Sequence, residues 1–294
     1  MSHDPASARA DPLISIDDLA ARLADPGLRI VDVRWYLGRP GDGRRAYEAG
    51  HLPGAIHLDI DRELTASEGP GRHPLPDPRR FAAQLGAVGI GDRHLVVAYD
   101  DVGGWVAARL WWMLDDLGHA RVAVLDGGIG AWVAAGHPLT TAEPAWPPEE
   151  LRLAGQWTRT VDLAGLRERL GTAVLLDARG APRYRGEVEP IDAYPGHIPT
   201  AVNAPTDGNL TPDGRFLPAE ALHARFAGLG AAGERDVVTS CGSGVAACHN
   251  ALAMRIAGLR DPLLYPGSYS DWSRAGLPVE VGDAPGDAPG DPPA

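Results

Sequence analysis

The sequence predicts an α/β protein made of two tandem domains, each a mostly parallel sheet flanked by helices. Short apolar runs that suit buried strands alternate along the chain with longer stretches of helical period. This alternation is typical of parallel sheets, whose strands are joined by helical crossovers. A set of sequence landmarks also occurs twice in the same order, which indicates that one domain has been duplicated.

Four pairs of landmarks carry the repeat. The second member of each pair follows the first by about 140–146 residues, a period too long for a solenoid. The pairs are Asp32-Val33-Arg34 with Asp177-Ala178-Arg179, Gly50-His51-Leu52-Pro53 with Gly196-His197-Ile198-Pro199, Leu95–Tyr99 before Asp100 with Asp236–Ser240 before Cys241, and Gly130-Ala131-Trp132 with Ser270-Asp271-Trp272. We therefore expect domains at 12–140 and 158–281, separated by a linker rich in proline and acidic residues. The low-complexity segment 282–294 is expected to be a disordered tail.

The expected strands are short apolar runs, whose length favours strands over helices. They are Leu28–Val33, Leu95–Ala98, Val122–Leu125, Ala173–Asp177, Val237–Thr239 and Leu263–Tyr265. A helix is expected at Val106–Leu117, where apolar residues recur at helical spacing, and another at Val245–Ala257, which Gly258 would end.

Composition excludes several classes of function. The chain of 294 residues has only two cysteines, too few for a disulfide framework or a four-cysteine zinc site. It contains no lysine, which excludes a lysine Schiff base and a Walker-type phosphate loop. The net charge of −12 disfavours nucleic acid as a partner. We find neither a membrane-length apolar run nor a secretory signal, so we expect a cytoplasmic protein.

The segment around Cys241 carries the strongest chemical signal. An apolar strand ends at this cysteine, Gly242 and Gly244 follow on either side of Ser243, and a helix begins. The glycines let several backbone N–H groups point at one atom, and the helix N-terminus adds positive potential. Both features favour a thiolate at Cys241. Cys248 lies on the apolar face of the helix and is expected only to pack.

The loop Cys241-Gly-Ser-Gly-Val-Ala resembles the CGSGVT loop of 3-mercaptopyruvate sulfurtransferases more than the CRKGVT loop of thiosulfate sulfurtransferases. The resemblance to this tandem-domain rhodanese family covers about residues 12–281. It includes Gly127-Gly128 with Trp132 and Tyr265-Pro-Gly-Ser with Asp271-Trp272. It implies two rhodanese-like domains, of which the first is catalytically silent because Asp100 stands where a nucleophile would be.

The resemblance also implies the residues of the site. The catalytic residues, a nucleophile with a Ser–His–Asp relay, are Cys241, Ser243, His73 and Asp61. The substrate-binding residues are Arg183, Gly242, Gly244 and Val245. No metal or organic cofactor is implied. The repeated Asp-x-Arg motifs, Asp32/Arg34 and Asp177/Arg179, are interpreted as structural ion pairs.

One departure from the family pattern affects the choice of donor. Mercaptopyruvate enzymes commonly carry a second arginine after Glu-Pro, but here Glu189-Pro190 is followed by Ile191-Asp192. Arg185 is a candidate replacement. The loop after Cys241 also lacks the cations that are usual in thiosulfate enzymes, so both donors remain open.

The leading hypothesis is a two-step transfer. Cys241 takes a sulfane sulfur from 3-mercaptopyruvate as a persulfide and passes it to cyanide, a small thiol or a thioredoxin-like protein. The alternatives are a thiosulfate:cyanide sulfurtransferase and a sulfur-carrier module for a protein partner. A phosphatase with a Cys-x₅-Arg loop is disfavoured because Ala247 stands at the arginine position.

Overall fold

The computed structural model describes residues 11–289 and divides the chain into two compact units. Unit 1 contains the chain up to Leu64, Pro76–Thr158 and Asp213–Arg215. Unit 2 contains Thr65–Leu75, Arg159–Pro212 and the chain from Phe216 onward. The predicted domains were contiguous, whereas in the structure the segment 65–75 belongs to unit 2 and the short segment 213–215 to unit 1.

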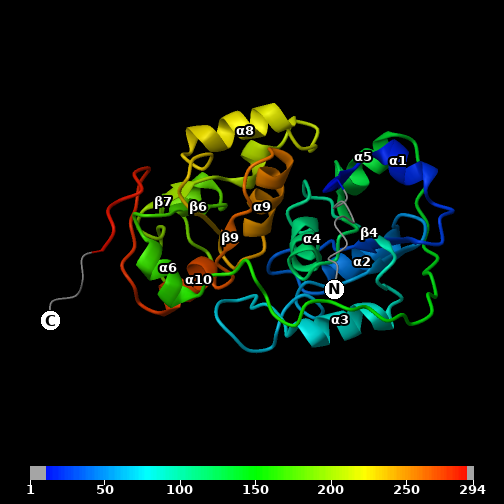
Figure 1. The fold of residues 1–294 in the computed structure, drawn as a ribbon. Coiled ribbons are helices and arrows are strands. Elements are labelled where there is room, and N and C mark those ends of the chain that lie inside the picture. The colour runs from blue at the N-terminus through cyan, green and yellow to red at the C-terminus, as the bar shows by residue number, and fades with distance from the viewer. Residues whose placement is uncertain (1–10, 290–294) are drawn as a thin grey trace, which may run out of the picture. The chain divides into compact units, whose positions relative to one another are not determined.

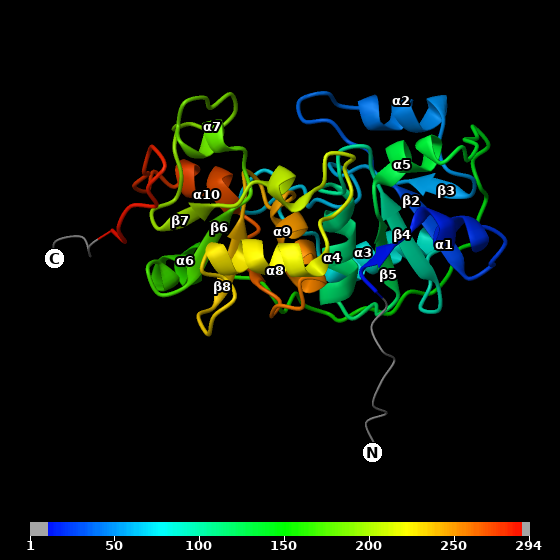
Figure 2. The ribbon, with the colours of Figure 1, turned by 90° about the horizontal axis from the view of Figure 1, so that it is seen from above.

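Unit 1 is built on a five-stranded parallel sheet of order β1-β5-β4-β2-β3. Figure 1 labels its strand β4, and Figure 2 labels β2, β3, β4 and β5. Every residue of the inner strands β2, β4 and β5 is buried, as expected of continuous apolar runs in a parallel sheet. Helix α4 packs on β4 and β5. The strands are Leu13–Ile14 (β1), Leu28–Asp32 (β2), Ala55–His57 (β3), Leu95–Tyr99 (β4) and Val122–Leu125 (β5). The helices are Ile16–Ala21 (α1), Asp42–Ala49 (α2), Pro78–Ala87 (α3), Ala107–Asp116 (α4) and Gly128–Ala134 (α5).

Unit 2 has a four-stranded parallel sheet of order β7-β6-β8-β9. Helix α9 packs on β8, and α8 packs on α9; both views show these yellow and orange helices beside each other (Figures 1 and 2). The strands are Val174–Asp177 (β6), Ala201–Asn203 (β7), Val237–Ser240 (β8) and Leu263–Leu264 (β9). The helices are Leu163–Arg169 (α6), Ala181–Tyr184 (α7), Ala219–Gly228 (α8), Ala247–Ile256 (α9) and Ser268–Arg274 (α10), with a 3₁₀ turn at Thr206–Asn209.

The predicted α/β class and all six predicted strands are confirmed, with ends within one residue. The helix predicted from Val245 begins two residues later, at Ala247. The physical reason is that Gly244, with φ of +79°, still belongs to the loop that wraps Cys241. The strands β1, β3 and β7, of two or three residues each, were not predicted.

The two units repeat the same side-chain contacts. In unit 1 the ring of Tyr47 stacks on His51 at 3.8 Å, and in unit 2 Tyr184 stacks on His197 at 3.8 Å. Each tyrosine hydroxyl donates to a backbone carbonyl of the neighbouring edge strand, at Ala55 or Ala201. The Gly-His-x-Pro landmarks read from the sequence therefore mark one recurrent packing unit.

The Asp-x-Arg landmarks are buried ion pairs, as predicted. Arg34 Nη2 lies 2.6 Å from Asp32, and Arg179 Nη2 lies 2.6 Å from Asp177. The same guanidinium nitrogens also donate to the carbonyls of Gly50 and Gly196, which begin the Gly-His-x-Pro landmarks. Each pair thus ties the end of a central strand to the loop before its neighbour.

The first residues of the predicted tail form backbone hydrogen bonds with other residues of unit 2. Gly282 N–H donates to the carbonyl of Arg185, and Pro285 accepts from Thr200 N–H at 2.6 Å. The bridge between His197 and Glu280 carries the chain alongside unit 2, and the prolines keep it extended with carbonyls available. Residues 290–294 of the predicted tail lie outside the described part. Across residues 11–289, every helix is too short or too polar to span a bilayer.

We expect Arg34→Ala to lower the free energy of unfolding of unit 1 by about 3–5 kcal/mol, because it leaves the buried Asp32 carboxylate without its cation. The matched control is Arg44→Ala. This residue pairs with Glu48 at 2.8 Å with 43% of its side chain exposed, and losing such a pair costs about 1 kcal/mol or less. Urea denaturation followed by circular dichroism measures both; equal shifts would contradict the role given to the buried pair.

Candidate active site

Cys241 stands at the carboxyl end of β8, directly after Ser240, and α9 begins six residues later. This is the edge at which open α/β sheets bind ligands. The residue is only 3% exposed. Its Sγ accepts hydrogen bonds from the backbone N–H of Gly244 at 3.1 Å and of Ser243 at 3.4 Å. Backbone donors aimed at one atom in this way stabilise negative charge on the sulfur.

Gly244 is required at its position for two reasons. Its φ of +79° lies in the left-handed region that favours glycine. A Cβ there would also come within 2.4 Å of the carbonyl oxygen of Pro266. Any other residue would push the loop away from Pro266 and turn the N–H groups away from the sulfur.

Residues 267–270, which we call the strap, hold the Cys241 loop in place. The N–H of Cys241 donates to Ser268 Oγ at 3.1 Å. In return, Tyr269 N–H donates to the carbonyl of Cys241 at 2.9 Å, and Ser270 N–H donates to that of Gly242 at 3.0 Å. Ser268 has φ of +50°, an uncommon conformation for a residue with a side chain. Its place in this hydrogen-bond network supports that backbone conformation.

The strap also fixes the segment 65–75 of unit 2. This segment contains His73, which was predicted as a site residue, and Arg72, which was not. Ser270 Oγ accepts from Arg72 N–H at 3.1 Å. Gly71 allows this approach, because a Cβ at that position would lie 2.5 Å from the carbonyl oxygen of Gly267. His73 follows and contacts the nucleophile loop: its Nδ1 lies 2.7 Å from Ser243 Oγ.

His73 and Ser243 form a buried pair beside the sulfur. They are 5% and 8% exposed. A serine hydroxyl hydrogen-bonded to an imidazole can give or take a proton. Because Ser243 also donates its backbone N–H to Cys241 Sγ, the pair lies directly beside that sulfur.

Asp61, the third predicted member of the relay, belongs to unit 1. There its Oδ2 accepts the indole N–H of Trp35 at 2.8 Å. Its part in the relay stays a prediction.

Two arginines lie against Gly242. A Cβ built there would be 2.8 Å from Arg72 Nη2 and 3.4 Å from Arg183 Nη1. Arg183 was predicted to bind substrate, whereas Arg72 was missed, although it directly precedes His73 in the sequence. The candidate replacement Arg185 pairs instead with Glu187 at 2.7 Å and with Asp283 at 3.6 Å.

Carboxylates orient these arginines from the other side. Arg183 Nη2 donates to Glu189 Oε1 at 2.7 Å and to Asp192 Oδ2 at 3.1 Å, and Arg72 Nη1 pairs with Asp192 Oδ1. Burial acts to raise the pKa of Glu189, but backbone N–H groups of Asp192 and Ile191 and the Arg183 guanidinium together lower it below its ordinary value. Glu189 is therefore a charged, fixed partner of Arg183.

Other residues in and next to the Cys241 loop stabilise its conformation. Val245 is 2% exposed, and its carbonyl accepts from Cys248 N–H at 3.1 Å. Cys248 is fully buried in α9, and its thiol donates to the carbonyl of Gly244 at 3.4 Å. Ser268 and Ser270, which position the nucleophile, were not recognised as such in the sequence, because a short Ser-rich stretch does not show which loop it contacts.

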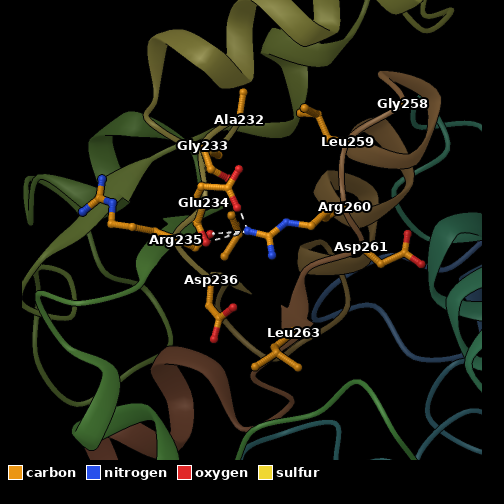
Figure 3. A pocket seen from close by; sticks show the side chains of 12 residues that line it. Ala232, Gly233, Glu234, Arg235, Asp236, Gly258, Leu259, Arg260, Asp261 and Leu263 are labelled. Carbon is orange, nitrogen blue, oxygen red and sulfur yellow. Dashed lines mark hydrogen bonds between the residues drawn. The ribbon is translucent and has the colours of Figure 1, made fainter.

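A hollow in unit 2 lies at the end of β8 opposite to Cys241 (Figure 3). It has a volume of about 420 Å³ and is lined by residues of 231–237 and 258–263. Arg260 points into it and donates from Nη2 to the carbonyls of Glu234 and Arg235. No cysteine, histidine or serine is among the described residues of this lining, so it lacks the side-chain types that meet around Cys241. Within residues 11–289, His, Cys, Asp and Glu side chains form no group of three that could hold a metal ion.

The chain is similar to a known protein family along most of its length. The model of the rhodanese-like domain matches the chain twice, at residues 15–135 and 162–275. The chain belongs to the rhodanese family. The prediction made from the CGSGVA loop and the repeat is confirmed.

Relatives of this rhodanese are sulfurtransferases. It is 46% identical over 279 residues to a probable 3-mercaptopyruvate sulfurtransferase of Pseudomonas aeruginosa, covering 92% of this chain and 98% of that one. It is 40% identical over 278 residues to a putative thiosulfate sulfurtransferase of Mycobacterium tuberculosis, covering 90% and 95%. The crystal structure of a 3-mercaptopyruvate sulfurtransferase from Escherichia coli matches with a TM-score of 0.79 at 30% identity, covering 88% and 99%. The chain is thus a sulfurtransferase with two rhodanese domains.

The loop geometry of this rhodanese can be tested with a pair of glycine variants. We expect Gly244→Ala to reduce turnover by about a hundredfold or more, because it withdraws the N–H groups from the sulfur. Gly258→Ala is the matched control: it also has positive φ, +69°, but open space around its Cβ position. Steady-state rates and circular dichroism are measured on both. A loss of activity shared by the two folded variants would speak against a specific role of the loop.

Proposed function

We propose that this sulfurtransferase moves a sulfane sulfur from 3-mercaptopyruvate to a thiol or cyanide through a persulfide on Cys241. The observation that carries the proposal is the pairing of His73 with Ser243 Oγ at 2.7 Å beside a sulfur that accepts two backbone N–H groups. It combines a stabilised nucleophile with a nearby source of a proton.

The first half-reaction forms the persulfide. The Cys241 thiolate attacks the sulfur of the donor, and the carbon–sulfur bond of the donor breaks. The bonding electrons leave with the carbon as the enolate of pyruvate, which takes a proton delivered through Ser243 and His73. In the second half-reaction an acceptor thiolate or cyanide attacks the outer sulfur and releases the Cys241 thiolate.

Arg183 and Arg72 are proposed to bind the donor carboxylate. Planar guanidinium groups suit a carboxylate through paired hydrogen bonds. Both lie against Gly242, next to the nucleophile. In this proposal Arg72 takes the place that the sequence left open after Glu189-Pro190, and the loop of Gly242, Gly244 and Val245 surrounds the reacting sulfur.

Thiosulfate is the second candidate donor, and the name of the M. tuberculosis relative favours it. The chemistry of the site favours mercaptopyruvate. Cleavage of thiosulfate releases sulfite, which is a stable anion and needs no proton, so a Ser–His pair would have no task. A thioredoxin-like protein is a further acceptor within the proposal. The net charge of −12 and the two free cysteines support an enzyme of a reducing, cytoplasmic compartment that does not bind nucleic acid.

Cys241→Ser is expected to abolish sulfur transfer, because the hydroxyl cannot form a persulfide. Cys248→Ser, the matched control, should retain it, since this thiol faces the carbonyl of Gly244 inside α9. Intact-protein mass spectrometry after incubation with 3-mercaptopyruvate should show a gain of one sulfur in the wild type and in the control only. A gain of sulfur in Cys241→Ser would contradict the assignment of the nucleophile.

Ser243→Ala tests the choice of donor. Loss of proton delivery should lower kcat with 3-mercaptopyruvate by about 10²-fold or more, while kcat with thiosulfate changes little because sulfite leaves unprotonated. Initial rates are measured with each donor and with cyanide as the common acceptor, and the fall in kcat is compared between the two donors. An equal fall with the two donors would show that Ser243 supports only the shape of the loop.

A further inference from the structure

Asp192 bridges the two arginines of the proposed donor site. Its Oδ1 pairs with Arg72 Nη1, and its Oδ2 accepts from Arg183 Nη2 at 3.1 Å. The side chain is 5% exposed. Its backbone N–H donates to Glu189 Oε1 at 3.0 Å, so the carboxylate is held within the loop that also provides Glu189.

The arginine nitrogens nearest Gly242 are not the ones that bond to Asp192. Arg72 uses Nη1 for Asp192, and its Nη2 is nearest a Cβ built on Gly242, at 2.8 Å. Arg183 uses Nη2 for the carboxylates, and its Nη1 is nearest that Cβ position, at 3.4 Å, with Nη2 at 3.8 Å. Each guanidinium thus keeps one terminal nitrogen close to the nucleophile loop. A donor bound there meets N–H donors of two cations whose opposite sides are already neutralised.

The arginines of this site are matched in number by carboxylates. The network has three arginines, Arg72, Arg179 and Arg183. It also has three carboxylates, Asp177, Glu189 and Asp192. Arg179 pairs with Asp177 and lies 3.5 Å from Glu189, which joins it to the other two arginines. The carboxylates of Glu189 and Asp192 are 3% and 5% exposed, so solvent and salt screen them poorly. A monoanion gains hydrogen bonds in such a site, whereas the second charge of a dianion meets the field of the buried carboxylates.

We propose that Asp192 is a specificity-determining residue that makes the donor site prefer a monoanionic donor over a dianionic one. 3-Mercaptopyruvate carries one negative charge at neutral pH and thiosulfate carries two. This inference rests on the proposed function, because it assumes that the donor binds between the arginines and the Cys241 loop.

The decisive variant is Asp192→Asn, which removes one negative charge and keeps the shape of the side chain. We expect kcat/KM for thiosulfate to rise about tenfold relative to kcat/KM for 3-mercaptopyruvate. Glu187→Gln removes an equal charge from the same loop, but its side chain is 54% exposed and pairs with Arg185, so the ratio should stay at the wild-type value. Asp192→Glu keeps the charge and should also keep the ratio, even if both rates fall.

If Asp192 had a purely structural role, Asp192→Asn would lower kcat/KM for both donors together and leave the ratio of the two values unchanged. That result would overturn the proposal. A ratio that shifts equally in Asp192→Glu would do the same. Mass spectrometry of the persulfide on Cys241 separates this failure from a failure of the proposed function. If the wild type takes sulfur from 3-mercaptopyruvate but Asp192→Asn does not change the ratio of kcat/KM values, only the role of Asp192 is wrong.

Inhibition of the wild-type enzyme by two small anions tests the same proposal without relying on variants that must fold. Methanesulfonate and sulfate share a tetrahedral sulfur with three or four oxygens and differ in charge by one. Against 3-mercaptopyruvate, we expect methanesulfonate to be the stronger competitive inhibitor at equal ionic strength. Tighter inhibition by sulfate would overturn the proposal.

Discussion

The backbone hydrogen bonds to Cys241 Sγ are the constraint on which the rest of the site depends. They require a positive φ at Gly244 and its close contact with Pro266. That contact in turn requires the 267–270 strap, whose hydrogen bonds hold the loop on both sides of the nucleophile. The strap also anchors Arg72, and His73 follows it directly. The proposed nucleophile, proton carrier and donor-binding cation are therefore positioned by one network.

Unit 1 shows what the same loop does without a thiol. Asp100 follows β4 as Cys241 follows β8, and its carboxylate accepts four backbone N–H groups, from Val102, Gly104, Val106 and Ala107, at 2.8–2.9 Å. Burial raises the pKa of Asp100, and these four hydrogen bonds oppose that effect. Its oxygens lie two bonds beyond Cβ, as the outer sulfur of a cysteine persulfide would. The loop architecture of this fold is thus suited to a polar or anionic atom at that distance.

The donor site combines cations with carboxylates that hold them. Glu189, Asp192 and Asp177 neutralise the buried Arg179 and the partly buried Arg72 and Arg183, and they also hold the guanidinium groups in place beside Gly242. In the proposed function, binding geometry and charge selectivity therefore have a common origin. An arginine pair without these partners would attract anions more strongly but would be less well oriented.

The sequence by itself determined the duplicated α/β fold, the strands and the family, and it singled out Cys241 as the proposed nucleophile. Each of these depends on contiguous residues: apolar runs for strands, and Cys241 between a strand, two glycines and a helix. Only the tertiary structure decided that the segment 65–75 belongs with unit 2, that Arg72 faces Gly242, and that Asp192 bridges Arg72 and Arg183. His73 and Ser243 are 170 residues apart in the chain. Contacts between such distant residues are set by how loops pack against the strap, and no local pattern encodes that packing.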